Sequence, residues 1–207
     1  MRLIEGDKLP TITTERLRLR WIELADAQAM FEIFSNAQAM RYWCTTPWVE
    51  PSEGVEFVES VQRCFCQHTL FEWAVVTADS DKPIGTCTLA SIDTDHRRAE
   101  IGFMLRPEFW GRGYMTEAVA ALLDFSFSTL RLHRIEADVD PRNDASLRLL
   151  ERLGFRREGR VRERWHVGDE INDGIILSLL RHEYAPSTRS ALDAAPPQDA
   201  DDTGRPR

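Results

Sequence analysis

One stretch near the middle of the chain constrains the fold most, because it joins a strand, a glycine-bearing turn and a helix. It reads Ile101-Gly-Phe-Met-Leu-Arg-Pro-Glu-Phe-Trp-Gly-Arg-Gly-Tyr-Met-Thr-Glu-Ala118. Residues 100–105 form a short apolar run of strand type, and Pro107 ends it by removing a ladder donor. A turn and a helix-period segment follow, reaching about Phe127. Glycines allow close approach of a ligand to the backbone, and the unpaired N–H groups of a helix start attract anions. The stretch therefore predicts an anion-binding turn.

The identity of the anion does not follow from this turn alone. Thr116 stands where a dinucleotide fingerprint would have its third glycine, and no Gly-Lys-Ser/Thr of a P-loop is present. An ordinary strand–helix loop with two convenient glycines explains the turn equally well. Other parts of the sequence are needed to distinguish an anion-binding turn from an ordinary loop.

Composition narrows the class of protein. The chain has 207 residues, 43% of them hydrophobic and 29% charged, which is typical of one globular domain. A formal net charge of −8 argues against a sequence-independent grip on nucleic acid. The four cysteines follow no zinc or redox spacing, so we expect reduced thiols, no metal site and a cytoplasmic location. We also expect no signal peptide, because residues 1–14 lack an apolar stretch, and no membrane span, because no apolar run approaches the roughly 20 residues that a span requires.

Hydrophobic periodicity predicts a mixed α/β domain over residues 1–185 and a disordered tail over 186–207. A first strand is expected at 15–21 and a first helix at 26–36. Ser52 is the expected N-cap of a second helix, with Val55, Val58, Val61 and Phe65 on its inner face. The remaining elements are strands at 71–77, 84–92, 99–105 and 134–139, helices at 116–127 and from Asn143 to Gly154, and a closing hairpin of 155–167 with 171–180. The step from 99–105 to 134–139 must be a parallel, right-handed crossover.

An aromatic segment between the first two helices has two explanations. Tyr42, Trp43 and Trp48 lie in an irregular stretch, where they serve either as the wall of a binding site or as a cap on the core.

Several spaced motifs together resemble one family. They are Thr14-Glu-Arg-Leu-Arg-Leu-Arg20, Ala99-Glu-Ile-Gly-Phe103, Trp110-Gly-Arg-Gly-Tyr-Met-Thr-Glu-Ala118, Asn143-Asp-Ala-Ser146, Leu153-Gly-Phe155 and Asp173. In this order they resemble the GNAT superfamily of acyl-CoA N-acyltransferases, most closely the Rim-type branch that includes ribosomal-protein N-terminal alanine acetyltransferases. The resemblance covers roughly Thr14 to Tyr184. It implies a mostly antiparallel sheet of about seven strands, helices on both faces and a splay between the fourth and fifth strands.

The resemblance also implies where acetyl-CoA binds. The pantetheine arm would pair with the backbone of Phe103, Met104 and Leu105. The diphosphate would lie on the loop formed by Trp110, Gly111, Arg112, Gly113, Tyr114, Met115 and Thr116, in which Met115 replaces the usual small residue. Arg112 either adds charge to this loop or is simply solvated. Asn143 and Ser146 would contact the thiol end, and a helix cap at Asn143 is compatible with that role.

Amine acetylation needs a neutral nucleophile and a departing thiolate. An α-amine has a pKa near ~8 and a lysine amine near ~10.4, so one carboxylate acting through water suffices for an α-amine. Glu100 matches a glutamate with this role in several family members; otherwise it is a solvated or arginine-paired strand-end residue. His96 and Asp138 are secondary candidates. Leu150 stands where many members have a tyrosine acid, so Ser146 is the group expected to hydrogen-bond the thiolate.

Three functions remain open at this point. The first is acetylation of a peptide or protein N-terminal α-amine, and the second is acetylation of a small amine such as a polyamine, an amino acid or an antibiotic. These two functions differ at Tyr42, Trp43, Trp48 and the closing hairpin near Trp165 and His166. The expected substrate contacts are Tyr42, Trp43 and Glu100. The third is a non-catalytic acyl-CoA-binding module. The oligomeric state is open, a homodimer included.

Overall fold

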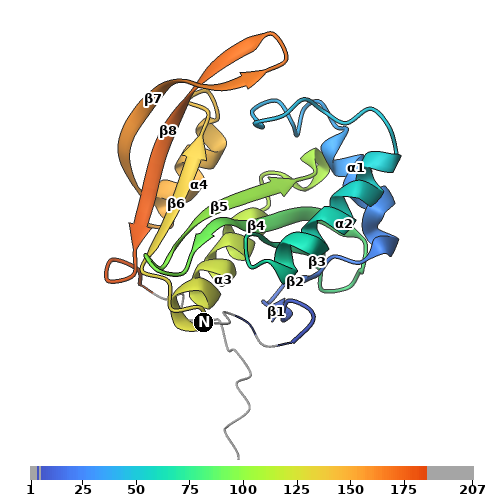
Figure 1. Cartoon of the computed structure of the whole chain (residues 1–207), viewed down its shortest axis with the longest axis horizontal. Coiled ribbons are helices and arrows are strands. Elements are labelled where there is room, and N and C mark those ends of the chain that lie inside the picture. Colours follow the sequence, from blue (N-terminus) through green and yellow to red (C-terminus); the bar gives the residue numbers. More distant parts are fainter. Residues whose placement is uncertain (1–3, 5, 186–207) are drawn as a thin grey trace, which may run out of the picture.

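The computed structural model describes residue 4 and residues 6–185. The predicted tail at 186–207 lies outside the described residues. The chain begins with the strands β1 (Ile12–Thr13) and β2 (Leu17–Trp21), a 3-10 turn at Leu24–Asp26, and the helices α1 (Ala27–Phe34) and α2 (Ser52–Cys66). Three strands follow, β3 (Phe71–Thr77), β4 (Pro83–Asp93) and β5 (Arg98–Leu105), and then a 3-10 turn (Pro107–Phe109) and α3 (Tyr114–Ser128). The last elements are β6 (Arg134–Val139), α4 (Asp144–Arg152), β7 (Arg156–Val167) and β8 (Glu170–Leu180) (Figure 1).

All the described strands join one sheet in the order β1-β2-β3-β4-β5-β6-β8-β7. Every neighbouring pair is antiparallel except β5 and β6, which are parallel as expected for the crossover through α3. The sheet has eight strands rather than about seven. The additional one, β1, has only two residues, which is too short to display an alternating pattern.

The predicted splay between β5 and β6 is present. Parallel pairing covers only Arg98, Ala99 and Glu100 of β5, opposite Arg134, Ile135 and Glu136 of β6. Beyond Glu100 the edge of β5 that faces β6 has no strand partner, whereas its other edge stays paired with β4 as far as Leu105.

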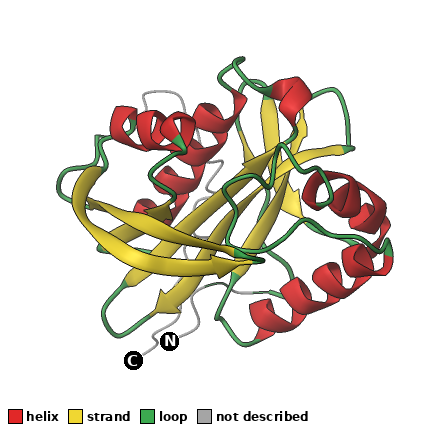
Figure 2. Ribbon diagram, turned by 90° about the horizontal axis from the view of Figure 1, so that it is seen from above, coloured by secondary structure: helices red, strands yellow, loops and turns green. Residues whose placement is uncertain are grey.

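Helices cover both faces of the twisted sheet (Figure 2). One core cluster joins α3 and α4 to the sheet. It includes the fully buried side chains of Trp73, Leu122, Leu123 and Leu150. A second cluster, centred on Phe34, joins α1 and α2 to the other face through Ala74 and Met104. Residues that alternate along β5 therefore belong to different clusters, Ile101 to the first and Met104 to the second.

Two details of α2 differ from the sequence prediction. Ser52 is the first helical residue and makes no capping bond; the carboxylate of Glu53 instead accepts from the backbone N–H groups of Val49 and Glu50, at 2.7 and 2.8 Å. The buried face carries Gly54, Val58, Val61 and Phe65, whereas Val55 is 39% exposed. Gly54 takes the inner place because a Cβ there would lie 2.2 Å from the Ala27 carbonyl oxygen of α1.

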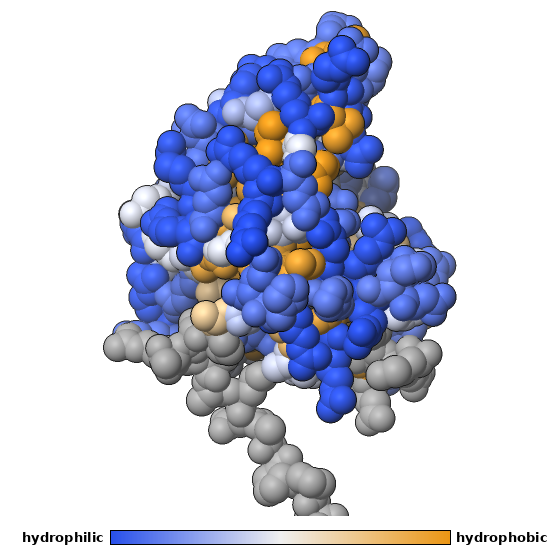
Figure 3. All heavy atoms as spheres, turned by 90° about the vertical axis from the view of Figure 1, so that its left-hand side faces the viewer, coloured by the Kyte–Doolittle hydropathy of each residue, from blue (hydrophilic) through white to orange (hydrophobic). Residues whose placement is uncertain are grey.

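The closing hairpin of β7 and β8 extends the far edge of the sheet. Nearly every residue of β7 is exposed, and the side of the molecule seen in Figure 3 is mostly hydrophilic. Among the described helices, none is long and apolar enough to cross a membrane.

Candidate active site

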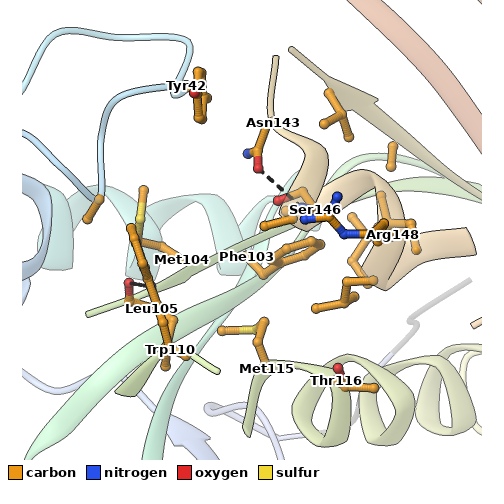
Figure 4. Close-up of a pocket in the computed structure, with 18 of the residues that line it drawn as sticks. Tyr42, Phe103, Met104, Leu105, Trp110, Met115, Thr116, Asn143, Ser146 and Arg148 are labelled. Carbon is orange, nitrogen blue, oxygen red and sulfur yellow. Dashed lines mark hydrogen bonds between the residues drawn. The ribbon is translucent and has the colours of Figure 1, made fainter. Parts of the chain in front are cut away.

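A long cavity of about 490 Å³ lies where β5 and β6 separate. Its lining includes almost every residue that the resemblance assigns to acetyl-CoA: Phe103, Met104, Leu105, Trp110, Gly111, Gly113, Tyr114, Met115, Thr116, Asn143 and Ser146. Among those labelled in Figure 4, the side chains come from β5, from the loop before α3, and from the starts of α3 and α4. Arg112 is not part of the lining.

The glycine loop is fixed to the strand that precedes it. The indole N–H of Trp110 donates to the carbonyl of Leu105 at 2.8 Å (Figure 4). Gly111 and Gly113 have φ angles of +73° and +78°, in the left-handed region that favours glycine. Gly113 is the N-cap of α3, and its carbonyl accepts the first helical bond, from the N–H of Glu117 at 3.1 Å. The helix start is thereby presented to the cavity, as anion binding requires.

Met115 does not obstruct this helix start. Its side chain is 6% exposed and packs into the core, with its sulphur 3.7 Å from that of Cys87.

Asn143 and Ser146 lie together at the start of α4. The Asn143 side chain accepts from the backbone N–H of Ser146 at 3.1 Å, so the predicted cap is present. The Ser146 hydroxyl makes no hydrogen bond to another described residue, which leaves it available to a ligand. Leu150, one turn further on, is 0% exposed and lines the cavity with an apolar side chain, which has no proton to give.

Two arginines of α4 also line the cavity, and the sequence analysis did not name them. Arg148 and Arg152 are four residues apart and so share one helix face. Arg148 is 67% exposed, and its contact with Asp144 is long, at 3.8 Å. Two basic residues at this spacing, next to the Asn-x-x-Ser motif, were the available signal.

The aromatic segment combines both predicted roles. Trp48 stacks on Phe34 with 4.7 Å between ring centroids, so it caps the second core cluster. Trp43 packs edge-on against Phe34 and also lines the cavity next to Gly102. Tyr42 is 39% exposed and lines the cavity without belonging to either core cluster.

Ion pairs connect the parts of the molecule around Tyr42. The guanidinium groups of Arg41 and Arg142 lie over its ring, at 5.6 and 5.7 Å from the centroid. Both arginines pair with Glu170 at the tip of the β7–β8 hairpin, each at 3.3 Å. Arg142 also holds Asp140 at 2.6 Å. The Tyr42 end of the cavity is thus bordered by carboxylates that already have arginine partners.

Asp138 is a buried carboxylate that lines the cavity from β6. Its side chain is 4% exposed, and one oxygen accepts from Arg164 at 2.9 Å and from the Trp165 indole at 3.2 Å. The other oxygen has no hydrogen-bond partner among the described residues. Gly174 of β8 leaves room for this group, because a Cβ there would lie 2.2 Å from the unpaired oxygen.

Glu100 lies beside this arrangement, one residue before the lining begins at Ile101. Burial raises the pKa of Glu100, and the charge of Asp138 raises it further, while the guanidinium of Arg164 lowers it. The carboxylate of Glu100 forms no hydrogen bond or ion pair with the other described residues. His96, by contrast, is 76% exposed in the β4–β5 turn, where it pairs with Asp93, and it does not line the cavity.

Cys44 faces the same region. Partial desolvation and then the charges of Glu100 and Asp138 raise the pKa of its thiol, although the residue remains accessible to solvent. The thiol therefore stays protonated at neutral pH and is a poor nucleophile. In the described part of the chain no cluster of His, Cys, Asp or Glu is arranged to hold a metal ion.

A sheet that splays beside a glycine loop and a helix start defines a class of protein that binds an extended, phosphate-bearing ligand. The chain belongs to the GNAT acetyltransferase family: the family model described as "Acetyltransferase (GNAT) domain" matches residues 16–156. The relative named Uncharacterized N-acetyltransferase p20, from Bacillus licheniformis, is 35% identical over 177 residues, which are 86% of this chain and 99% of the relative.

Solved structures agree with this assignment. Spermidine N-acetyltransferase from Vibrio cholerae, in complex with CoA and spermine, superposes with a TM-score of 0.73 at 27% identity, covering 81% of this chain and 97% of that one. Ribosomal-protein-S5-alanine acetyltransferase from Vibrio fischeri also gives 0.73, at 25% identity, covering 86% and 100%. The chain is an acyl-CoA-dependent N-acetyltransferase that uses acetyl-CoA, rather than a non-catalytic module. The acceptors of these relatives differ, from a polyamine to a ribosomal protein.

Proposed function

We propose that the chain acetylates the N-terminal α-amine of a peptide or protein, by direct attack of the amine on acetyl-CoA in a ternary complex. The observation that carries this proposal is the state of the carboxylates around the acceptor side. Asp138, Asp140 and Glu170 are each paired with an arginine. A polyamine carries several cations and needs several unpaired carboxylates, whereas an α-amine brings one cation that only has to lose its proton.

Glu100 is the proposed general base. Its raised pKa brings the carboxylate closer to that of an α-amine, which favours proton transfer through water at neutral pH. As the amine nitrogen forms its bond to the acetyl carbon, the nitrogen gives up a proton to Glu100 and the carbon–sulphur bond breaks. The thiolate leaves with a hydrogen bond from Ser146, and its own pKa of roughly 8.5 makes a strong acid unnecessary.

Acetylation of a small amine is the second candidate, because the Vibrio cholerae structure at 27% identity is a complex with CoA and spermine. The exposed ring of Tyr42 would then cover the bound amine. A cytoplasmic location remains part of the proposal, supported by four free cysteines in the described residues. A homodimer remains a prediction.

The test is release of free thiol from acetyl-CoA across amine classes. One panel contains peptides with a free α-amine, the same peptides blocked at the α-amine but carrying lysine, and spermidine. We expect turnover only with the free α-amine. Turnover with spermidine and none with any peptide would favour the second candidate.

A matched variant tests the proposed base. Glu100→Gln is expected to lower kcat at neutral pH by about 100-fold, the range of general base catalysis, while leaving the Kd for acetyl-CoA unchanged. Glu151→Gln is the control, since Glu151 lies near the end of α4, already pairs with Arg157 at 2.7 Å and is not among the charges that shift the pKa of Glu100. An unchanged rate for Glu100→Gln would remove Glu100 from the mechanism.

A further inference from the structure

Arg16, almost 100 residues before the glycine loop, makes a set of contacts that the proposed reaction does not explain. Its guanidinium donates from Nε to the Glu117 carboxylate at 2.6 Å and from Nη1 to the Arg112 carbonyl at 3.0 Å. It also lies over the Tyr114 ring, 4.8 Å from the centroid. One side chain from the start of β2 thus touches the loop and the first turn of α3.

The Glu117 carboxylate is held from several directions. Besides Arg16 Nε, it accepts from the backbone N–H of Arg16 at 2.9 Å and from the hydroxyl of Thr14 at 2.6 Å. Burial alone would raise the pKa of Glu117, but these bonds outweigh burial and keep the pKa below its usual value. The motif Thr14-Glu-Arg16 therefore has a defined partner in space.

Glu117 presents an electrostatic difficulty for a phosphate site. A carboxylate in the first turn stabilises the helix through its dipole, but it also repels a diphosphate bound at the same end. The salt bridge with Arg16, at 2.6 Å, offsets that charge. Glu117 and Arg16 are both outside the cavity lining, whereas Gly111, Gly113 and Tyr114 of the loop and helix start belong to it.

The contact with the Arg112 carbonyl has a consequence for the next amide. The C=O of Arg112 and the N–H of Gly113 belong to one planar trans peptide unit, so they point in opposite directions. Because Arg16 binds the carbonyl from behind, the N–H of Gly113 points away from Arg16. Gly113 lines the cavity, Arg112 does not, and the N–H of Gly113 has no acceptor among the described residues.

We propose that Arg16 is a positioning residue for acetyl-CoA: it orients the Arg112–Gly113 peptide so that its N–H faces the diphosphate, and it neutralises Glu117 behind the loop. Two glycines with left-handed φ angles have wide conformational freedom, so an external contact is needed to fix the peptide between them. The inference rests on the proposal that this loop binds the diphosphate.

The test compares two acetyl donors, acetyl-CoA and S-acetylpantetheine, which lacks the diphosphate and adenosine. For Arg16→Ala we expect kcat/KM with acetyl-CoA to fall about tenfold or more, as for loss of a charged hydrogen bond, through KM rather than kcat. With S-acetylpantetheine, kcat/KM should stay within about twofold of the wild type. If Arg16 had only a structural role, Arg16→Ala would lower kcat/KM equally with both donors. That result, or no loss with either donor, would overturn the proposal.

Arg18→Ala is the matched control, because Arg18 is two residues further along the chain, in β2, but pairs with Asp81, at 3.0 Å. Arg18→Ala should leave kcat/KM unchanged with both donors. If Arg16→Ala does not fold, Arg16→Lys serves in its place. Lysine keeps the positive charge but lacks the several N–H donors of the guanidinium. It should therefore show a smaller loss of kcat/KM, again only with acetyl-CoA. Wild-type protein that fails to bind coenzyme A in calorimetry would refute the diphosphate site itself, whereas normal coenzyme A binding by Arg16→Ala refutes only the role of Arg16.

Discussion

The pKa of Glu100 is set by burial and by the charges of three side chains from other strands, Asp138, Arg164 and Glu136. Burial and the charge of Asp138 raise its pKa, and Arg164, which donates to Asp138 at 2.9 Å, lowers it. The guanidinium of Arg164 therefore opposes the effect that burial and the Asp138 charge have on Glu100.

The pH profile of kcat/KM should therefore move in opposite directions in two variants. Its acid limb reports ionisation of Glu100 if Glu100 is the base. Asp138→Asn removes a charge that raises the pKa of Glu100, so the limb should move to lower pH; Arg164→Ala removes a charge that lowers it, so the limb should move to higher pH. Arg160→Ala, which breaks a pair with Asp173 on the same hairpin, is the control. Movement of both variants in one direction would contradict this coupling.

Arg148 should contribute to donor affinity, since it lines the cavity from α4 and no strong ion pair holds it. Arg148→Ala is expected to raise the KM for acetyl-CoA by about three- to tenfold with little change in kcat, as loss of one exposed phosphate contact would. Arg63→Ala is closely matched, because Arg63 is 65% exposed and pairs with Glu59 four residues away at 3.9 Å. Steady-state kinetics at saturating acceptor measure both, and equal effects would argue against a specific role for Arg148.

At the scale of elements, the loop before α3 depends on backbone conformation rather than on space. A Cβ at Gly113 would meet only Arg16 Nη2, at an acceptable 3.5 Å, but the φ of +78° disfavours any side chain by roughly 1–2 kcal/mol. Gly113→Ala should therefore raise the Kd for coenzyme A at least about fivefold as the loop relaxes. Gly159→Ala in β7 has open space and no positive φ, so it should leave the Kd unchanged. Calorimetric titration of both variants decides the point.

The sequence could predict the elements whose signals are local. The strand–turn–helix around Gly113, the cap at Asn143 and the closing hairpin across Gly168 each rest on neighbouring residues, and the structure contains all three. Two elements depend on distant partners instead. β1 forms only because Ile12 pairs with Leu19, and Val55 faces solvent because Gly54 has to approach α1.

The same distinction applies to the site. Motif residues such as Phe103 and Ser146 could be predicted, because the resemblance carries them position by position, and they do line the cavity. The arginine partners of Asp138 and Glu170 could not, because they reach these carboxylates from segments up to 129 residues away. Charge pairing across a sheet leaves no pattern along the chain.

For the whole molecule, the cavity and the segments that border it belong to different parts of the fold. The donor cavity forms where β5 and β6 separate, against α3 and α4, and both helices are fixed in the larger core cluster. The segment after α1 and the β7–β8 hairpin meet through Glu170 and Arg41. If these two segments hold the acceptor, as proposed, variation in them would change the acceptor without disturbing acetyl-CoA binding. Relatives that share the fold do differ in the acceptor that their names give.

The free energy of unfolding should depend on pH through Glu72, a carboxylate in strand β3. It is 4% exposed and accepts from the Thr88 hydroxyl at 2.6 Å, yet burial raises its pKa from 4.5 to about 7. Because the folded pKa lies above the unfolded one, the stability from this residue is fully present below about pH 4.5 and is lost as pH rises through about 7. The difference between the two pKa values corresponds to about 3 kcal/mol at most.

Urea unfolding at about pH 5 and about pH 8 tests this expectation. The free energy of unfolding of the wild type should fall by about 2–3 kcal/mol between these pH values, and Glu72→Gln should remove that fall. Glu59→Gln, on the exposed side of α2, should keep that fall. An equal pH dependence for the wild type and Glu72→Gln would mean that Glu72 stays ionised inside the fold.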